Sequence, residues 1–206
     1  NNRVFLTMYG GADRYFIKNN AYRTYGINWS NNVGTLRWNH VFNNKLFCNT
    51  TFIYSRYNYF IQIWKENQDF WASHIYQGTL KSDFSWFINP KLTWRQGLEL
   101  STYDSDPGNI HLRQDSLESY LPFTPKFLSG TSVYYSTIEQ QLGEKFFLNY
   151  GFRSTLWTNY GPTTVYYFDD AHQVTDTVDF NGGDKIISFS AFELRFSASY
   201  MHKTGS

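Results

Sequence analysis

The chain has 206 residues, of which 21% are aromatic (19 Phe, 17 Tyr and 7 Trp) and only 17% are charged. This composition excludes a disordered chain, which requires low hydrophobicity and a high net charge. The 18 basic and 17 acidic side chains leave a formal charge of +1, and no Lys/Arg-rich run occurs, so a nucleic-acid-binding surface is excluded as well.

Cys48 is the single cysteine of the sequence, which rules out an internal disulfide and a zinc site built on several thiolates. No apolar run approaches the roughly 18 residues that a transmembrane helix requires. The first three residues lack the features of a signal peptide, which leaves a mature, an internal or a cytoplasmic segment open.

Apolar and polar residues alternate along nearly the whole chain, and this period of two predicts β-strands rather than helices. Within residues 34–41, for example, Leu36 and Trp38 share one face and Arg37 points to the other. One strand at residues 3–9, hairpins across 43–44, 89–90 and 143, and a last strand at 186–200 predict eight antiparallel strands.

The predicted connections alternate strictly between short and long. Short turns are expected at 43–45, 89–91, 142–144 and 201–204, and long connections at 10–32, 58–73, 104–128 and 158–184. A soluble β-sandwich shows the same alternation along its strands, but it has no reason to place every short turn at one end and every long loop at the other, as outer-membrane barrels do, so the asymmetry favours a barrel. Runs of about twelve residues, 44–56 and 145–157, also suit strands that cross a membrane at a tilt.

If the strands form a membrane barrel, the side chains on the two faces of each strand meet different surroundings. The apolar rows point to lipid, and the opposite rows point to the lumen, because a basic side chain facing lipid at mid-depth costs about 2–4 kcal/mol. Tyr and Trp near the strand ends are expected to form interfacial girdles. The predicted outward set is Leu36, Trp38, Phe84, Trp86, Leu98, Leu148, Phe152, Leu194 and Phe196. The predicted lumen charges are Arg37, Lys81, Asp83, Arg95, Glu99, Arg153, Glu193 and Arg195. The girdle candidates are Tyr22, Tyr25, Trp29, Tyr54, Tyr57, Tyr59, Trp64, Trp71, Trp157, Tyr160, Tyr166 and Tyr167.

Several strand and turn phrases resemble the barrels of TonB-dependent outer-membrane receptors of the kind abundant in Bacteroidota. The phrases are GTLRWNHVFNNKLF at 34–47, NTTFIYSRY at 49–57, TLKSDFSWFINP at 79–90, FLNYGFR at 147–153 and FELRFSASY at 192–200. The resemblance runs over most of the chain.

This resemblance implies a larger, 22-stranded barrel closed by a plug, of which residues 1–206 supply about eight strands and no plug. It implies a transporter for active uptake of a specific ligand, located in the bacterial outer membrane, and no enzyme. The implied partners are outer-membrane lipid, the rest of the barrel and the plug, a TonB-type energy-coupling protein acting through the plug, and a possible surface lipoprotein.

No catalytic, cofactor or metal site is predicted. The histidines His40, His74, His111, His172 and His202 have no second ligand at a suitable spacing, and no nucleophile elbow or phosphate-binding glycine loop occurs. The acid pairs Asp104/Asp106 and Asp169/Asp170 invite a calcium site, but Asp115 stands where a full calcium loop has glutamate, and turn chemistry explains the acids without a metal. Ligand contacts are expected mainly from the long connections, as in residues 160–180, and no ligand is assigned.

Two alternatives remain open at this stage. A self-contained eight-stranded outer-membrane barrel requires a ladder between residues 3–9 and 186–200, whereas a larger barrel leaves both of these strands as open edges. A soluble β-sandwich, such as a carbohydrate-binding module, requires that the apolar rows be buried in a packed core.

Overall fold

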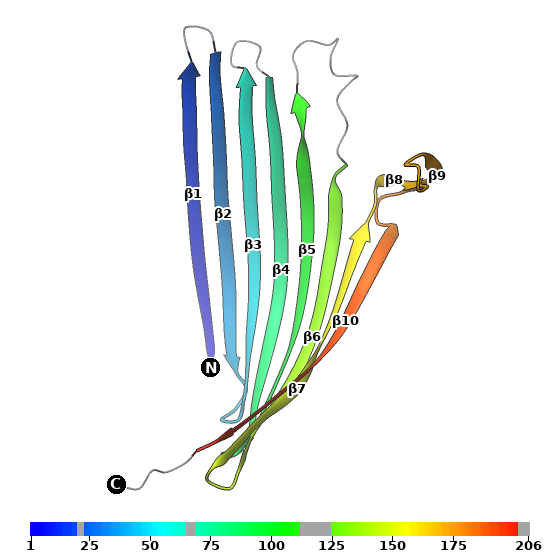
Figure 1. The fold of residues 1–206 in the computed structure, drawn as a ribbon. Coiled ribbons are helices and arrows are strands. Elements are labelled where there is room, and N and C mark those ends of the chain that lie inside the picture. The colour runs from blue at the N-terminus through cyan, green and yellow to red at the C-terminus, as the bar shows by residue number, and fades with distance from the viewer. Residues whose placement is uncertain (20–22, 65–68, 112–124, 202–206) are drawn as a thin grey trace.

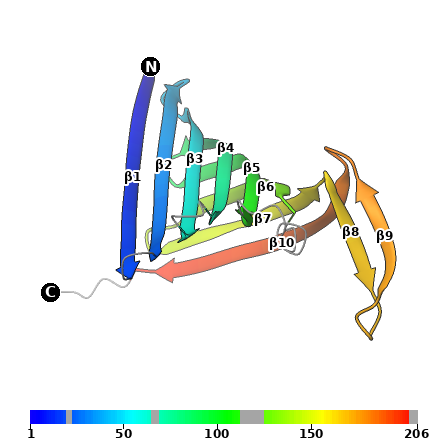
Figure 2. The same ribbon diagram turned by 90° about the horizontal axis from the view of Figure 1, so that it is seen from above.

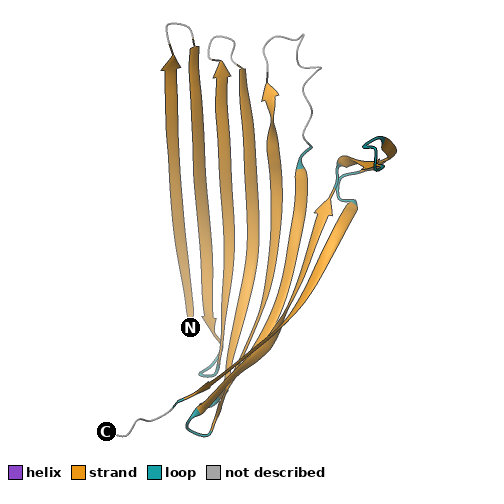
Figure 3. Ribbon diagram, viewed as in Figure 1, coloured by secondary structure: helices purple, strands orange, loops and turns teal. Residues whose placement is uncertain are grey.

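The computed structural model describes residues 1–19, 23–64, 69–111 and 125–201, and every regular element in these ranges is a β-strand (Figure 3). No helix of the described residues is long and apolar enough to cross a membrane. The strands are β1 (Asn2–Asn19), β2 (Arg23–Val41), β3 (Leu46–Trp64), β4 (Asp69–Asn89), β5 (Leu92–His111), β6 (Phe127–Leu142), β7 (Phe146–Tyr160), β8 (Thr163–Phe168), β9 (Val174–Phe180) and β10 (Lys185–Tyr200).

Eight strands form one antiparallel sheet in the order β1-β2-β3-β4-β5-β6-β7-β10, and β8 pairs with β9 in a separate hairpin. The sheet is curved and twisted, with β1 and β10 at its two edges (Figures 1 and 2). The predicted all-β fold and the eight-stranded antiparallel sheet are therefore confirmed, and the curvature is that of a barrel segment.

The turns at 43–45, 90–91 and 143–145 lie at one end of the sheet, and β1, β3, β5 and β7 end at the other (Figure 1). This arrangement confirms the predicted topology. The turn between β2 and β3 is closed by the side chain of Asn43, whose Oδ1 accepts hydrogen bonds from the backbone N–H groups of Lys45 (2.8 Å) and Leu46 (3.0 Å). Asn residues favour tight turns because they supply this local acceptor.

The predicted strand boundaries at the other end are wrong. Residues assigned to long connections continue the ladders: Gly10 pairs with Asn32, Asn58 with His74, and Asp104 with Leu128. The strands of the main sheet are consequently 15 to 21 residues long. The connection predicted at 158–184 contains the β8–β9 hairpin, which is joined to the sheet where the Gly161 N–H donates to the Asp184 carbonyl at 2.9 Å.

The main sheet has no packed core among the described residues. Cys48 and Val133 are its only buried apolar side chains there, and the described residues contain no second sheet that covers either face. A sandwich core is therefore absent from the part of the chain that the structure describes. No ladder joins β1 to β10 in these ranges, so the pairing required by a self-contained eight-stranded barrel is not present.

Candidate functional site

The ladder registers divide the sheet into two faces by residue number. In each of the seven ladders the paired numbers add to an even value over most of the length, for example 42 between β1 and β2 and 288 between β6 and β7. Directly paired residues share a face, and successive residues alternate. Between the register shifts near the strand ends, even-numbered residues therefore form one face, here called the even face, and odd-numbered residues form the odd face.

Charge is confined to one of these faces in the part of the sheet next to the short turns. We call this part the central section; it comprises residues 2–8, 34–41, 46–54, 78–88, 92–102, 130–142, 146–158 and 188–200. It contains ten Lys, Arg, Asp and Glu residues, and all ten have odd numbers. They are Arg3, Arg37, Lys81, Asp83, Arg95, Glu99, Glu139, Arg153, Glu193 and Arg195.

The even face of the central section is apolar and uncovered. Leu98 is 48% exposed, Phe196 73% and Leu194 81%. Every residue of the predicted outward set has an even number and every predicted lumen charge has an odd number, so the predicted division of the faces is confirmed by the registers. The odd face is more closely packed, because the described side chains that are buried there are Thr51, Thr79, Ser85, Ser101 and Val133, whereas those on the even face are Cys48 and Thr158.

The height of the apolar region matches the thickness of a bilayer core. On β4 it extends from residue 78 to residue 88, which corresponds to about 33 Å along a strand. A tilt of about 40° projects this length to about 25 Å, the height of the apolar band in outer-membrane barrels. On β4, between residue 78 and the end far from the short turns, charged and polar residues enter the even face, where the ladders align Asn32 with Arg56 and Asn58 with His74. The Phe60 and Phe70 rings stack on the same face, so its polarity there is mixed.

The polar side chains of the even face pair with one another. Trp94 Nε1 donates to Ser136 Oγ at 2.8 Å, and the Tyr134 hydroxyl donates to Gln96 Oε1 at 3.2 Å. The hydroxyls of Thr50 and Ser82 lie 3.0 Å apart, and the Tyr150 hydroxyl donates to Gln140 Oε1 at 3.2 Å. An open surface in water does not need such pairs, whereas polar groups without water require them.

The odd face of the central section carries a network of polar contacts. The Tyr135 hydroxyl donates to Asp83 Oδ1, and Lys81 Nζ lies 3.7 Å from Asp83 Oδ2 and 5.6 Å from the centre of the Tyr135 ring. The Tyr135 ring lies directly over Gly97, where a Cβ atom would collide with it. Gly97 thus provides the space that lets Tyr135 reach across β5 to β4.

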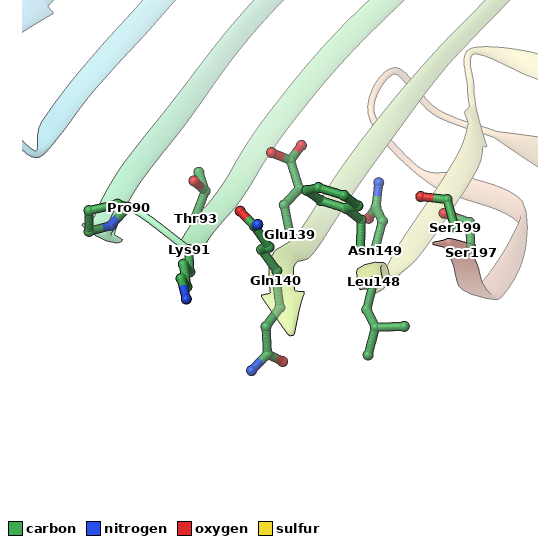
Figure 4. Close-up of a pocket in the computed structure, with 11 residues that line it drawn as sticks. Pro90, Lys91, Thr93, Glu139, Gln140, Leu148, Asn149, Ser197 and Ser199 are labelled. Carbon is green, nitrogen blue, oxygen red and sulfur yellow. The ribbon is translucent and has the colours of Figure 1, made fainter. Parts of the chain in front are cut away.

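Near the short turns, the odd face is hollowed by a shallow cavity of about 350 Å³ (Figure 4). In this view Glu139 and Asn149 point to the hollow side, whereas Gln140 and Leu148 point to the opposite face. Arg95 engages Glu139 through both carboxylate oxygens, at 3.0 and 3.2 Å. The lining is mostly polar, and its carboxylate, that of Glu139, is paired with Arg95, which suits contact with another polar surface better than a reaction.

Farther from the short turns, the odd face becomes aromatic. Trp29 pairs with Tyr59 across the ladder, and the Tyr59 and Trp71 rings meet edge to face with centroids 6.1 Å apart. Trp29, Tyr57, Tyr59, Trp71 and Trp157 are therefore on the odd face, and their assignment to outward girdles is wrong. Tyr54 and Tyr160 do lie on the even face, Tyr166 and Tyr167 lie on the β8–β9 hairpin, and Tyr22 lies outside the described residues.

The histidines and acid pairs have structural roles where the structure describes them. His40 Nδ1 lies 2.6 Å from Asn2 Oδ1, and His74 stacks on Tyr76 with centroids 4.3 Å apart. Asp106 accepts from the Gly108 N–H (2.9 Å) and pairs with Lys126 (3.3 Å). Asp169 likewise accepts from two backbone N–H groups, those of Ala171 and Gln173. His172 has a positive φ of 60° in the connection between β8 and β9. His202 and Asp115 lie outside the described residues.

Bulge and turn hydrogen bonds thus account for Asp106 and Asp169, one acid of each pair considered for a calcium site. Among the described residues no three His, Cys, Asp or Glu side chains are grouped closely enough to hold a metal ion. The sequence analysis identified neither Glu139 nor the Tyr135–Gly97 contact. The alternation along the strand could have placed Glu139 on the same face as the other charged residues.

Comparisons with known proteins do not assign a function to these two faces. No protein-family model, no curated protein and no solved structure matches the chain.

Proposed function

We propose that residues 1–206 form part of the wall of an outer-membrane β-barrel transporter of the TonB-dependent type, with the even face in contact with lipid and the odd face lining the lumen. The observation that carries the proposal is the placement of ten charged side chains on one face of the central section and none on the other.

Energetics supports lipid as the medium on the even face. A basic side chain at the bilayer midplane of a barrel costs about 2–4 kcal/mol, which is a large fraction of the roughly 5–15 kcal/mol by which a typical protein is stable. The side-chain pairs Trp94–Ser136 and Tyr134–Gln96 satisfy polar groups that lipid cannot solvate. In water, the same uncovered face would be a large apolar patch and an aggregation hazard.

The open edges of the sheet support a barrel larger than eight strands. β1 and β10 each present one unpaired backbone edge within the described residues, and open edges do not occur in hydrocarbon. Neighbouring strands of a 22-stranded barrel would pair with both edges, and eight strands would then cover about a third of the circumference. The transport role itself rests on the sequence resemblance described above. It entails a plug, a TonB-type coupling protein and no enzymatic step.

The membrane part of the proposal is tested by fractionation of cells that produce the full-length protein. We expect the protein in the outer-membrane fraction, resistant to washing with urea or carbonate, and soluble only in detergent. Recovery in the soluble fraction would contradict the proposal.

The transport part is tested genetically. Deletion of the gene and deletion of the TonB-type coupling gene should abolish the same uptake phenotype, with the double deletion no more severe than either alone. Uptake that survives loss of the coupling protein would contradict an energy-coupled transporter while leaving the membrane location intact.

A further inference from the structure

The charges on the odd face of the central section balance one another except at one place. Eight of the ten have an opposite charge either in an ion pair or directly opposite in a ladder. The ion pairs are Lys81–Asp83, Arg95–Glu139 and Arg195–Glu193, and the ladders place Glu99 opposite Lys81 and Arg153 opposite Glu193. Arg3 and Arg37 have neither kind of partner among the described residues, and both side chains are exposed.

The position of Arg37 decides from which side a carboxylate could reach it. Arg37 lies on β2, between Phe5 of β1 and Thr51 of β3. Directly opposite and diagonal side chains are the ones that interact across a sheet. The diagonal neighbours of Arg37 on the odd face are Arg3, Thr7, Asn49 and Ile53, none of which is acidic. Because β1 and β3 already flank β2, no further strand can lie beside Arg37. A carboxylate can therefore approach it only from the side that the odd face looks onto.

An unsatisfied amide oxygen lies beside the two arginines. Asn39 is directly opposite Arg3 in the ladder, and its Oδ1 is buried without a hydrogen-bond partner among the described residues. Arg3, Asn39 and Val41 line a hollow of about 380 Å³ at this place. The guanidinium groups require acceptors, whereas the amide oxygen requires a donor. A polypeptide with an Asp or Glu side chain supplies both, but an inorganic anion such as sulfate supplies acceptors only.

The apolar side chains around the arginines also match a polypeptide partner. Phe5 is 48% exposed and Val41 44% exposed, and both share the odd face with Arg3 and Arg37. We call Arg3, Phe5, Arg37, Asn39 and Val41 the arginine surface. Arginine and aromatic residues are enriched in protein–protein interfaces. A surface that combines them with unpaired positive charge is complementary to a segment that is acidic and partly apolar.

We propose that the arginine surface docks an acidic segment of the same full-length polypeptide, with an Asp or Glu carboxylate held between Arg3 and Arg37 and an N–H group donating to Asn39 Oδ1. A segment of the same chain is favoured over a separate protein because the surface faces an enclosed lumen, which a tethered segment reaches at a high effective concentration. This inference rests on the proposed function, because it requires the odd face to line the lumen of a larger barrel.

Photo-cross-linking of the full-length protein in its membrane tests the proposal, with p-benzoylphenylalanine in place of Phe5, which lies directly opposite Arg37. Mass spectrometry of the digested product should show a cross-link from residue 5 to a peptide elsewhere in the same chain that contains Asp or Glu. The matched control carries the probe in place of Leu6, which is 64% exposed on the even face, and it should not give this cross-link.

Charge substitutions show whether Arg37 holds the segment. With the probe at residue 5, Arg37→Gln should lower the yield of the cross-link about tenfold, the effect of losing a hydrogen bond to a charged group, and Arg37→Lys should lower it less. Arg195→Gln removes the same charge from the odd face of β10, at the opposite edge of the sheet, and should leave the yield unchanged. In an Arg37→Glu protein, exchange of the identified acid for arginine should restore the cross-link.

The proposal is overturned if residue 5 cross-links to no peptide of the chain, if the linked peptides contain neither Asp nor Glu, or if Arg37→Gln leaves the yield unchanged. Heat-modifiable migration of each variant in a gel, a property of folded outer-membrane barrels, is checked in parallel. Such results, together with cross-links from residue 6 to lipid, would refute the docking surface and leave the barrel intact. Cross-links from residue 5 to lipid and from residue 6 to polypeptide would refute the proposed function instead.

Discussion

Substitution of Leu98 by arginine is the perturbation that separates a lipid-facing even face from a water-facing one. Leu98 is six residues from the turn-side boundary of the central section of β5 at residue 92, and four from the upper boundary at residue 102. With about 3.3 Å per residue and a tilt of about 40°, these distances correspond to depths of about 15 and 10 Å. Leu98 therefore lies close to the middle of the band.

At that depth, Leu98→Arg should lower the free energy of unfolding by about 2–4 kcal/mol. In water, the same substitution at a side chain 48% exposed would change it by about 0.5 kcal/mol or less. The matched control is Asn49→Arg, because Asn49 belongs to the row Asn49–Asp83–Gly97, one residue from Leu98 in depth but on the odd face. There the new guanidinium would lie opposite the Asp83 carboxylate, and stability should stay within about 1 kcal/mol of the wild type.

The assay is reversible denaturant unfolding of the full-length protein in phospholipid vesicles, followed by tryptophan emission. A loss for Leu98→Arg at least 1.5 kcal/mol greater than that for Asn49→Arg is the expected result. Equal losses for the two variants, or a larger loss for Asn49→Arg, would refute the assignment of the faces.

Three further predictions concern individual contacts. Gly97→Ala should lower the free energy of unfolding by about 1–3 kcal/mol, because the new methyl group would displace the Tyr135 ring. Tyr135→Phe should lower it by about 1 kcal/mol, because the hydrogen bond to Asp83 is lost. Denaturant midpoints measure both effects, and a Gly97→Ala variant as stable as the wild type would show that the Tyr135 ring does not lie over Gly97. Asn43→Ala should cost about 1 kcal/mol by leaving the Lys45 and Leu46 N–H groups without their acceptor, and Asn43→Asp, which restores an acceptor, should recover most of it in the same measurement. Cys48 is 4% exposed, so a maleimide should label it only after denaturation, and rapid labelling of the folded protein would contradict the packing around it.

The alternation of residues in the central section was enough to predict the strands of the main sheet and which residues of each strand share a face. Leu36–Arg37–Trp38 and Phe152–Arg153 are read without ambiguity because one neighbour tolerates lipid and the other does not. The same physics explains why strand ends could not be predicted. Above the band both faces carry mixed polarity, so the period of two fades, although ladder hydrogen bonds continue through pairs such as Gly10 and Asn32.

Residues with strong turn preferences caused the remaining errors. Asp106, Pro107 and Gly108 read as a turn that ends a strand, but they form a bulge within β5, because an extra residue can be accommodated by a positive φ at glycine without ending the ladder. The Trp and Tyr side chains on the odd face above the central section were assigned to an interfacial girdle for a related reason. Without the strand extensions, Trp29 and Tyr59 had no register, and only the register assigns them to the odd face.

Site-directed spin labelling along residues 92–102 of β5 in the full-length protein, reconstituted into phospholipid bilayers, tests the central claim most directly. Collision rates with oxygen, which concentrates in lipid, and with a water-soluble nickel chelate are measured at each position. We predict that even positions such as 94, 98 and 100 collide preferentially with oxygen, most strongly near 98, and that odd positions such as 95 and 99 do not share that preference. Preferential collision of the even positions with the nickel chelate, or the absence of a period of two, would contradict the placement of the even face in lipid.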